Sequence, residues 1–274
     1  MHKDVTPGHT EIAALAAALR EAETRVEGME PPTAMFPRLS LADAYAVQRA
    51  GIHARVARGE RLIGRKIGLT SRAIQEQLGV DEPDFGAITD AMVIGDGGSL
   101  DPAVLLQPRV EAEFAFEIGH DLPPDPGLHE VIAAVSGVAV AMEIIDSRVT
   151  DWRITLLDTV ADNASMARVV WGDFVPASAE LLAELPDSVV SLLRDGTEVS
   201  AGPGSAVLGD PLRSLHWLAR ALGAHGDVLR SGDRVLAGAV SAAADFTPGS
   251  TWSVHSAGLP AASITSTPQP TSAS

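Results

Sequence analysis

QPRVEAEFAFEIG, residues 107–119, alternates polar and apolar side chains along its length. On a β-strand, side chains point alternately to opposite faces, so this period places Glu111, Glu113 and Glu117 on one face. On a helix, Glu111 and Glu113 would point about 200° apart, so they stand side by side only on a strand. The alternation therefore predicts a strand whose glutamates are either paired ligands or members of a solvated outer face, as is common in antiparallel sheets.

A third carboxylate lies in an apolar run. Glu143 belongs to VAVAMEIID, whose flanking side chains predict a buried strand. A buried lone carboxylate costs several kcal/mol unless it is paired, protonated or bound to a metal. Glu143 therefore either pairs with an arginine, such as Arg148 or Arg153, or joins Glu111 and Glu113 around a cation. Because the chain has no cysteine and no histidine pair at ligand spacing, such a cation would be Mg²⁺ or Mn²⁺.

Three further polar positions stand out. Lys66 lies between two glycines in LIGRKIGLT, a predicted strand, where it is either an edge-strand lysine or a functional group. Asp84 belongs to a turn-rich acidic loop, DEPDFG, where most aspartates are turn residues. DTVADNAS, residues 158–165, concentrates small polar groups, and it predicts either a ligand-facing loop or an Asx-type turn.

Patterning divides the chain into parts. Residues 1–60 are predicted to be a helical N-terminal region, and residues 61–266 show short β-like runs punctuated by glycine and proline. Asp195-Gly196 is a hairpin signal within the second part. Residues 267–274 have little apolar surface to bury and are predicted to be disordered. The fold expected from this pattern is α+β with a sheet-rich core.

Four helices carry recognisable start signals. One is predicted over residues 10–26 with Thr10 as its N-cap. A second begins at Ser40, with Asp43 completing a capping box. Its predicted apolar face contains Gln48 as the one polar residue and is otherwise formed by Leu41, Tyr45, Ile52 and Val56. The others cover residues 71–79 and the segment after Asp210, which caps a proline-initiated helix.

Composition excludes several classes of function. The chain has 274 residues, with 20 Lys and Arg against 36 Asp and Glu, and this net charge of −16 argues against nucleic-acid binding. The absence of cysteine excludes disulfides and thiolate catalysis and fits a reducing cytosol. The longest apolar stretch is too short to span a membrane, and the first residues lack a signal-peptide pattern. We expect a cytoplasmic protein with no membrane contact.

Six segments together resemble the 2-oxopent-4-enoate hydratases and 2-oxo-3-hexenedioate decarboxylases of the fumarylacetoacetate-hydrolase-like superfamily. In chain order they are AYAVQ, GRKIGLTS, EPDFG, QPRVEAE, EIIDSR and DTVADNAS. The similarity runs from near residue 40 to about residue 260. It implies a mixed β-roll or sandwich core of the fumarylacetoacetate-hydrolase C-terminal type. It also implies a homo-oligomer, a pentamer or decamer, that could form a complex with a pathway enzyme.

The resemblance also implies a site. Family members bind Mg²⁺ or Mn²⁺ through three carboxylates, which correspond here to Glu111, Glu113 and Glu143. The active-site lysine of the family corresponds to Lys66, and the acidic residue of its PDFG loop to Asp84. Asn163 and Ser165 correspond to positions that hydrogen-bond the substrate.

The function implied is the metal-dependent addition of water to 2-hydroxypenta-2,4-dienoate, which gives 4-hydroxy-2-oxopentanoate in the meta-cleavage degradation of aromatic compounds. Lys66 would stabilise charge and orient the substrate, while Asp84 would transfer a proton or position water. The first alternative is 2-oxo-3-hexenedioate (4-oxalocrotonate) decarboxylation, but the decarboxylases tend to carry an apolar residue in place of Asp84. The second is an inactive partner subunit, because Ala237 stands where many relatives have Thr or Ser.

Overall fold

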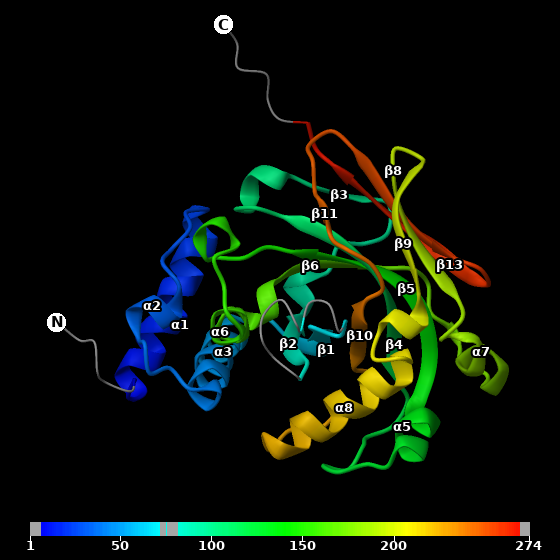
Figure 1. The fold of residues 1–274 in the computed structure, drawn as a ribbon, viewed down its shortest axis with the longest axis horizontal. Helices are drawn as coiled ribbons and strands as arrows, with labels where there is room; N and C mark the ends of the chain where they lie inside the picture. The colour runs from blue at the N-terminus through cyan, green and yellow to red at the C-terminus, as the bar shows by residue number, and fades with distance from the viewer. Residues whose placement is uncertain (1–6, 72–74, 76–81, 269–274) are drawn as a thin grey trace, which may run out of the picture.

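The computed structural model describes residues 7–71, 75 and 82–268, and it contains two β-sheets with helices around them (Figure 1). The larger sheet has the order β2 (Asp84–Thr89), β1 (Leu62–Gly68), β10 (Arg234–Ala239), β4 (Arg109–Ile118), β5 (Val135–Ile145) and β6 (Met166–Trp171). Two short strands extend it, β11 (Ala244–Asp245) beside β4 and β7 (Val175–Pro176) beside β5. The smaller sheet has the order β3 (Gly98–Leu100), β13 (Leu259–Ser266), β12 (Thr251–Ser256), β8 (Val189–Arg194) and β9 (Thr197–Pro203).

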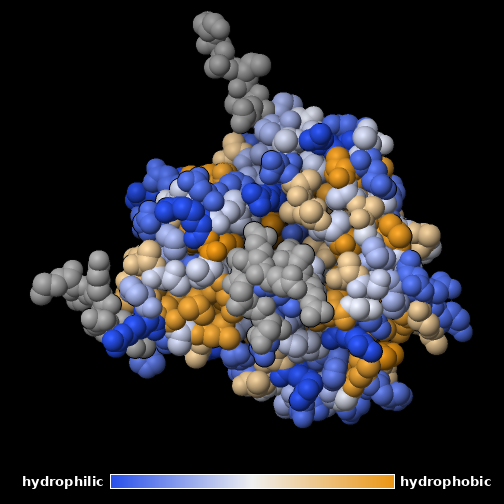
Figure 2. Space-filling model, viewed as in Figure 1, coloured by the Kyte–Doolittle hydropathy of each residue, from blue (hydrophilic) through white to orange (hydrophobic). Residues whose placement is uncertain are grey.

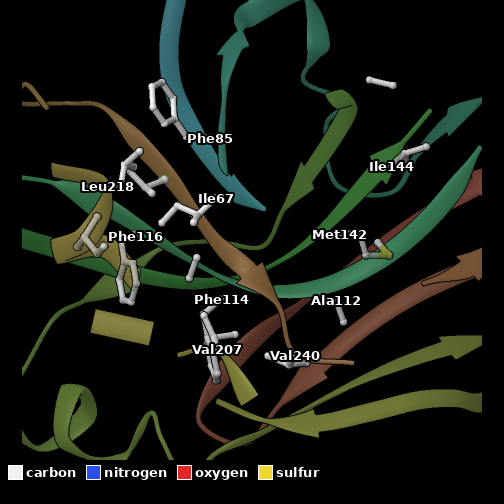
Figure 3. Close-up of a cluster of buried hydrophobic side chains, with 14 of the residues drawn as sticks. Ile67, Phe85, Ala112, Phe114, Phe116, Met142, Ile144, Val207, Leu218 and Val240 are labelled. Carbon is white, nitrogen blue, oxygen red and sulfur yellow. The ribbon is translucent and has the colours of Figure 1, made fainter. Parts of the chain in front are cut away.

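The core lies between and around these sheets. Strand β5 bends through the molecule, and it contacts β12 and β13 of the smaller sheet (Figure 1). The apolar face of β4 is fully buried there, and Figure 3 shows Phe114 and Phe116 among the side chains of this core cluster. Burial of this face accounts for the apolar half of the alternation in residues 107–119, because each fully buried large side chain stabilises the fold by about 1.5–3 kcal/mol.

The helices cover the sheets from two sides. They are α1 (His9–Arg25), α2 (Pro32–Met35), α3 (Leu41–Val56), α5 (Leu128–Ala134), α6 (Leu156–Ala161), α7 (Ala179–Glu184) and α8 (Pro211–Ala224). The three N-terminal helices lie beside α6, while α8 packs on β10 and β1 (Figure 1). Hydrophilic residues spread over the face in Figure 2, with smaller apolar patches between them. Among the described residues, no helix is long and apolar enough to cross a membrane.

Most of the predicted helix starts are confirmed. Ser40 caps α3 with Asp43 in a capping box, and the side chain of Asp210 accepts from Leu212 N–H at the start of α8. The N-cap of α1 is Gly8 rather than the predicted Thr10, because Glu11 accepts a hydrogen bond from Gly8 N–H. The helix predicted over residues 71–79 falls almost wholly outside the described residues.

The apolar face predicted for α3 is confirmed at Tyr45 and Gln48 but wrong at its ends. Leu41 and Val56 are exposed, whereas Tyr45, Val47 and Gln48 are buried. The amide of Gln48 donates to the carbonyls of Phe85 and Val160, at 2.9 and 3.0 Å. The hairpin prediction is confirmed, since Asp195 and Gly196 both have positive φ between β8 and β9, as a type I′ turn requires. Strand β1 begins at Leu62, close to the predicted change at residue 60.

Candidate active site

The three glutamates meet because of strand register. In the antiparallel pair of β4 and β5, Glu111 lies directly opposite Glu143, and Glu113 is the next residue on the same face of β4. One carboxylate oxygen from each lies within 4.8 Å of the other two. Glu113 is 1% exposed and Glu143 is fully buried. The interpretation of this face as solvated is therefore wrong.

Several buried oxygens without a hydrogen bond mark this carboxylate cluster. Both carboxylate oxygens of Glu143 and one of Glu113 are buried without a hydrogen bond, while the other oxygen of Glu113 accepts from Gly238 N–H at 2.7 Å. Burial and the charge of Glu143 raise the pKa of Glu111 to about 7, and burial raises the pKa of Glu113 well above its usual range. Glu113 and Glu143 are buried with unsatisfied oxygens, while Glu111 is half-buried and lines the cavity. Three carboxylates in this arrangement fit a hard divalent cation, so the cluster could hold a metal ion.

Glu143 pairs with a lysine and not with an arginine. Its Oε1 lies 3.3 Å from Lys66 Nζ, whereas Arg148 pairs with Asp162 and Arg153 with Glu30. Of the two alternatives for Glu143, pairing with an arginine is therefore wrong. Because Glu143 is distant in sequence from Lys66, only the tertiary structure identifies Lys66 as its partner.

Lys66 lies inside the sheet, since β1 runs between β2 and β10. The edge-strand interpretation of Lys66 is wrong for that reason. Its side chain is buried, and Nζ also donates to the carbonyl of Ala164 at 3.0 Å. Burial by itself lowers the pKa of Lys66, but the carboxylates of Glu143 and Asp84 outweigh it and raise the pKa. Lys66 is therefore a fixed, buried positive charge beside the carboxylate cluster.

Asp84 begins β2 and faces the same region. It is 2% exposed, and its Oδ1 is buried without a hydrogen bond. Gly68 lies opposite it on β1, and a Cβ atom at Gly68 would stand 2.2 Å from that oxygen. Burial raises the pKa of Asp84, while the charge of Lys66 opposes this shift. Asp84 is thus a buried carboxyl group whose proton can be gained or lost near Lys66.

A strained turn borders the site. Asn163, Ala164 and Ser165 all have positive φ, of 55°, 51° and 57°, a conformation that costs about 1–2 kcal/mol for each non-glycine residue. The predicted loop over residues 158–165 is only partly a loop, because α6 continues to Ala161. Ser165 Oγ lies 3.3 Å from Thr159 Oγ1. The turn points the Ala164 carbonyl at Lys66 and brings Ser165 to the cavity wall.

Asn163 anchors this turn to β2. Ala87 N–H donates to Asn163 Oδ1 at 2.8 Å, and Asn163 Nδ2 donates to the Ala87 carbonyl at 2.9 Å. The turn and strand β2 approach each other closely at Gly86, where a Cβ atom would stand 2.6 Å from the Asn163 carbonyl oxygen. Of the predicted site residues, Lys66, Asp84, Glu111 and Ser165 line the cavity, whereas Glu113, Glu143 and Asn163 do not. The side-chain amide of Asn163 is occupied by the backbone of Ala87.

Arg148 holds both ends of the turn. Its guanidinium donates to Asp162 Oδ1 at 2.5 Å and to the Asp162 carbonyl at 2.6 Å, while a third bond reaches the Met166 carbonyl at 3.2 Å. Both side chains are buried. Sequence reasoning considered Arg148 only as a partner of Glu143 and missed this role. Arg148 follows a buried strand by only three residues, which is a weak signal of burial and does not identify the partner.

A cavity of about 630 Å³ opens beside these groups. Its polar wall contains Lys66, Asp84, Glu111 and Ser165. The remaining described lining residues are mostly apolar and include Leu69, Ile145, Trp152, Ile154 and Val240. Ala237 is not among them, and its carbonyl accepts from Ser214 Oγ at 2.6 Å. The cavity therefore has one polar, charged side, which we call its floor and which is suited to an acid group. Its other side is an apolar wall, suited to a carbon chain.

Comparison with known proteins gives close relatives. The chain is 42% identical to 2-keto-4-pentenoate hydratase from Paraburkholderia xenovorans (strain LB400) over 256 residues, 93% of this chain and 94% of that protein. The structure of 4-oxalocrotonate decarboxylase from Pseudomonas putida G7, complexed with magnesium and adipate, has 35% identity and a TM-score of 0.90, and the match covers 96% and 99% of the two chains. No family model matches the chain.

The fold is shared with more distantly related structures. Fumarylacetoacetate hydrolase from Exiguobacterium antarcticum matches with a TM-score of 0.60 at 14% identity, over 77% of this chain and 76% of that one. At this identity the match shows the fold alone. The predicted α+β fold of the fumarylacetoacetate-hydrolase type, with a helical N-terminal part, is confirmed.

Proposed function

The chain belongs to the family of 2-keto-4-pentenoate hydratases, and we propose that it hydrates 2-hydroxypenta-2,4-dienoate, the enol form of that acid, to 4-hydroxy-2-oxopentanoate. We place this reaction in the meta-cleavage degradation of aromatic compounds. The observation that carries the proposal is the buried Lys66 and Asp84 beside the carboxylate cluster, at the floor of one cavity. This arrangement combines a fixed positive charge, a proton-exchanging group and a candidate cation site.

Glu111, Glu113 and Glu143 are the proposed ligands of Mg²⁺ or Mn²⁺. The unsatisfied oxygens of Glu113 and Glu143 support this assignment, and the related decarboxylase structure contains magnesium. When bound, such a cation would supply Lewis-acid stabilisation to the negative charge that develops on the 2-oxygen of the substrate. The ammonium of Lys66 would add to this stabilisation, because Ala164 and Glu143 hold it in a buried position.

Asp84 is the proposed proton carrier. The dienol must first lose the proton of its 2-hydroxyl and gain one at C5 to become the α,β-unsaturated 2-oxo acid. Water then adds at C4 and gives up a proton, while C3 gains one. A carboxyl group whose pKa is raised by burial can donate a proton and take one from the attacking water. Ser165 is proposed to hydrogen-bond the substrate from the cavity wall, while Asn163 would support it by holding the turn.

The test is an absorbance assay with freshly generated 2-hydroxypenta-2,4-dienoate and 2-oxo-3-hexenedioate, each with Mg²⁺, Mn²⁺ or EDTA. We expect metal-dependent loss of the dienoate with formation of 4-hydroxy-2-oxopentanoate. Release of CO₂ from the diacid alone would refute this function in favour of the decarboxylase, and turnover of neither would favour an inactive partner subunit. Asp84→Asn should abolish most hydration, since it removes the proton carrier.

The ligand assignment has a matched control on the same strand. Glu111→Gln should weaken Mn²⁺ binding and activity together. Glu117 lies on the same face of β4, but it pairs with Arg234 at 3.4 Å, so Glu117→Gln should leave both unchanged. An active, metal-replete Glu111→Gln variant would refute the assignment.

The assembly and location are also proposals. The resemblance implies a homo-oligomer built on five-fold rings, a pentamer or decamer, in the cytoplasm. Light scattering on the purified protein measures the number of chains directly. A monomer in solution would contradict the proposed assembly without affecting the proposed reaction.

A further inference from the structure

Four arginines line an open groove outside the catalytic cavity. They are Arg20 on α1, Arg55 near the end of α3, Arg58 just beyond that helix, and Arg168 on β6. The groove has a volume of about 760 Å³, and none of its described lining residues lines the cavity that contains Lys66. The chain has a net charge of −16, yet four of its 20 basic residues meet at this one place.

The nearby carboxylates do not balance these arginines. Arg55 pairs with Glu23, which also lines the groove, and with Glu60 at 3.3 Å. Arg58 lies 3.8 Å from Glu60. The other two arginines of the groove form no ion pair with the described residues. Four guanidinium groups therefore meet two carboxylates, which leaves an excess of two positive charges.

Arg168 is half-buried, yet most of its hydrogen-bond donors are free. Its Nη1 donates to the carbonyl of Ala167 at 2.8 Å, and no other described residue accepts from its guanidinium, which has five N–H groups. Burial lowers the pKa of Arg168, and the positive charge of Arg55 adds to this shift while Glu23 opposes it. A bound anion would accept hydrogen bonds from the free N–H groups and offset the repulsion between the arginines.

A phosphate group matches this excess of charge better than a carboxylate does. A phosphate monoester has a charge of about −1.5 to −2 at pH 7 and three acceptor oxygens, whereas a carboxylate has a single charge and two oxygens. The planar guanidinium group binds phosphate oxygens in pairs. Val26 and Val104 also line the groove, and Val104 is 46% exposed, so the organic part of an ester would find apolar contacts there.

We propose that this arginine groove is a binding site for a phosphate group, either free phosphate or the phosphate of a small ester. Arg20 and Arg168 would bind the phosphate oxygens, because neither has an ionic partner among the described residues. Arg55 and Arg58 would add positive charge while they keep their own carboxylate partners. The site does not depend on the proposed hydration, since the groove and the catalytic cavity share no described lining residue.

The test titrates the Mg²⁺-loaded protein with inorganic phosphate, butyl phosphate and succinate in a calorimeter at low ionic strength. We expect both phosphates to bind at one site, and succinate to bind about tenfold more weakly, since its two charges lie on separate groups. Added salt should weaken the binding, because the groove is open to solvent. Tighter binding of butyl phosphate than of inorganic phosphate would identify the ligand as an ester, and equal binding would identify it as free phosphate.

Two variants and a matched control locate the site. Arg20→Gln and Arg168→Gln should each weaken the binding of butyl phosphate about tenfold, equivalent to about 1.4 kcal/mol. Arg25→Gln removes the same charge from α1 or its end, but Arg25 pairs with Glu21 at 2.9 Å and does not line the groove, so this variant should keep the full affinity. If Arg168→Gln does not fold, Arg20→Gln tests the site alone, since Arg20 is an exposed helix residue.

Several results would overturn the proposal. These are the absence of phosphate binding, binding of succinate as tight as that of the phosphates, and full affinity in Arg20→Gln and Arg168→Gln. Loss of phosphate binding in Glu111→Gln would place the phosphate at the proposed metal instead of the groove. Dissociation of an oligomer in Arg20→Gln, measured by light scattering, would assign the groove to a second copy of the chain.

Discussion

Replacing Arg148 by methionine tests how the strained turn is held. The change removes three hydrogen bonds and leaves Asp162, which is 3% exposed, as a buried carboxyl group without its cationic partner. Removing one member of a buried ion pair costs about 3–5 kcal/mol. Both side chains are almost fully buried, so solvent screening does not reduce this value. A loss of this size would lower the melting temperature by roughly 6–20 °C for a chain of this length.

Urea unfolding followed by circular dichroism measures this loss, and Arg153→Met is the matched control. Arg153 also forms an ion pair, with Glu30, but both side chains are more than half exposed, so its loss should change stability by under about 1 kcal/mol. Activity should fall in Arg148→Met because Ser165 and the Ala164 carbonyl move, while Mn²⁺ binding should persist because strands carry the ligands. Equal stability of the two variants would refute the argument that Arg148 holds the turn.

Three further predictions concern the metal and the turn. In the metal-free protein the pKa of Glu111 is raised to about 7 and that of Glu113 well above its usual range. Binding must therefore displace at least one proton, and Mn²⁺ affinity should be weaker by at least about tenfold at pH 6 than at pH 8. Calorimetry in buffers of different ionisation enthalpy would count that proton, and a pH-independent affinity would contradict the shift. Gly86→Ala puts a Cβ atom 2.6 Å from the Asn163 carbonyl oxygen, so it should cost about 1–3 kcal/mol in urea unfolding and lower kcat, whereas Gly95→Ala, in open space, should do neither. Mg²⁺ at a hundred times its Kd should stabilise the protein by about 2.7 kcal/mol, measured as a rise in melting temperature, and Glu111→Gln should abolish that rise.

The sequence by itself determined the local features of this protein. The period of two in residues 107–119 identified the strand and its glutamate face, Ser40 with Asp43 identified the start of α3, and Asp195-Gly196 identified a hairpin. These features depend on side chains a few residues apart, whose relative positions follow from backbone geometry alone. Local patterns singled out the candidate site residues and left the grouping of the three glutamates as one of two alternatives, and the family resemblance chose between these alternatives.

Only the tertiary structure decided which of these groups are buried and what they contact. The same alternation fits a solvated or a buried glutamate face, and burial here comes from strands and helices distant in sequence. The partners of Glu143, Arg148 and Asn163 likewise depend on the order of the strands in the sheet and on which loops pack against them. The physical reason is that desolvation and charge pairing depend on atoms that folding brings together from distant parts of the sequence. Periodicity and capping depend only on residues that are close in the sequence.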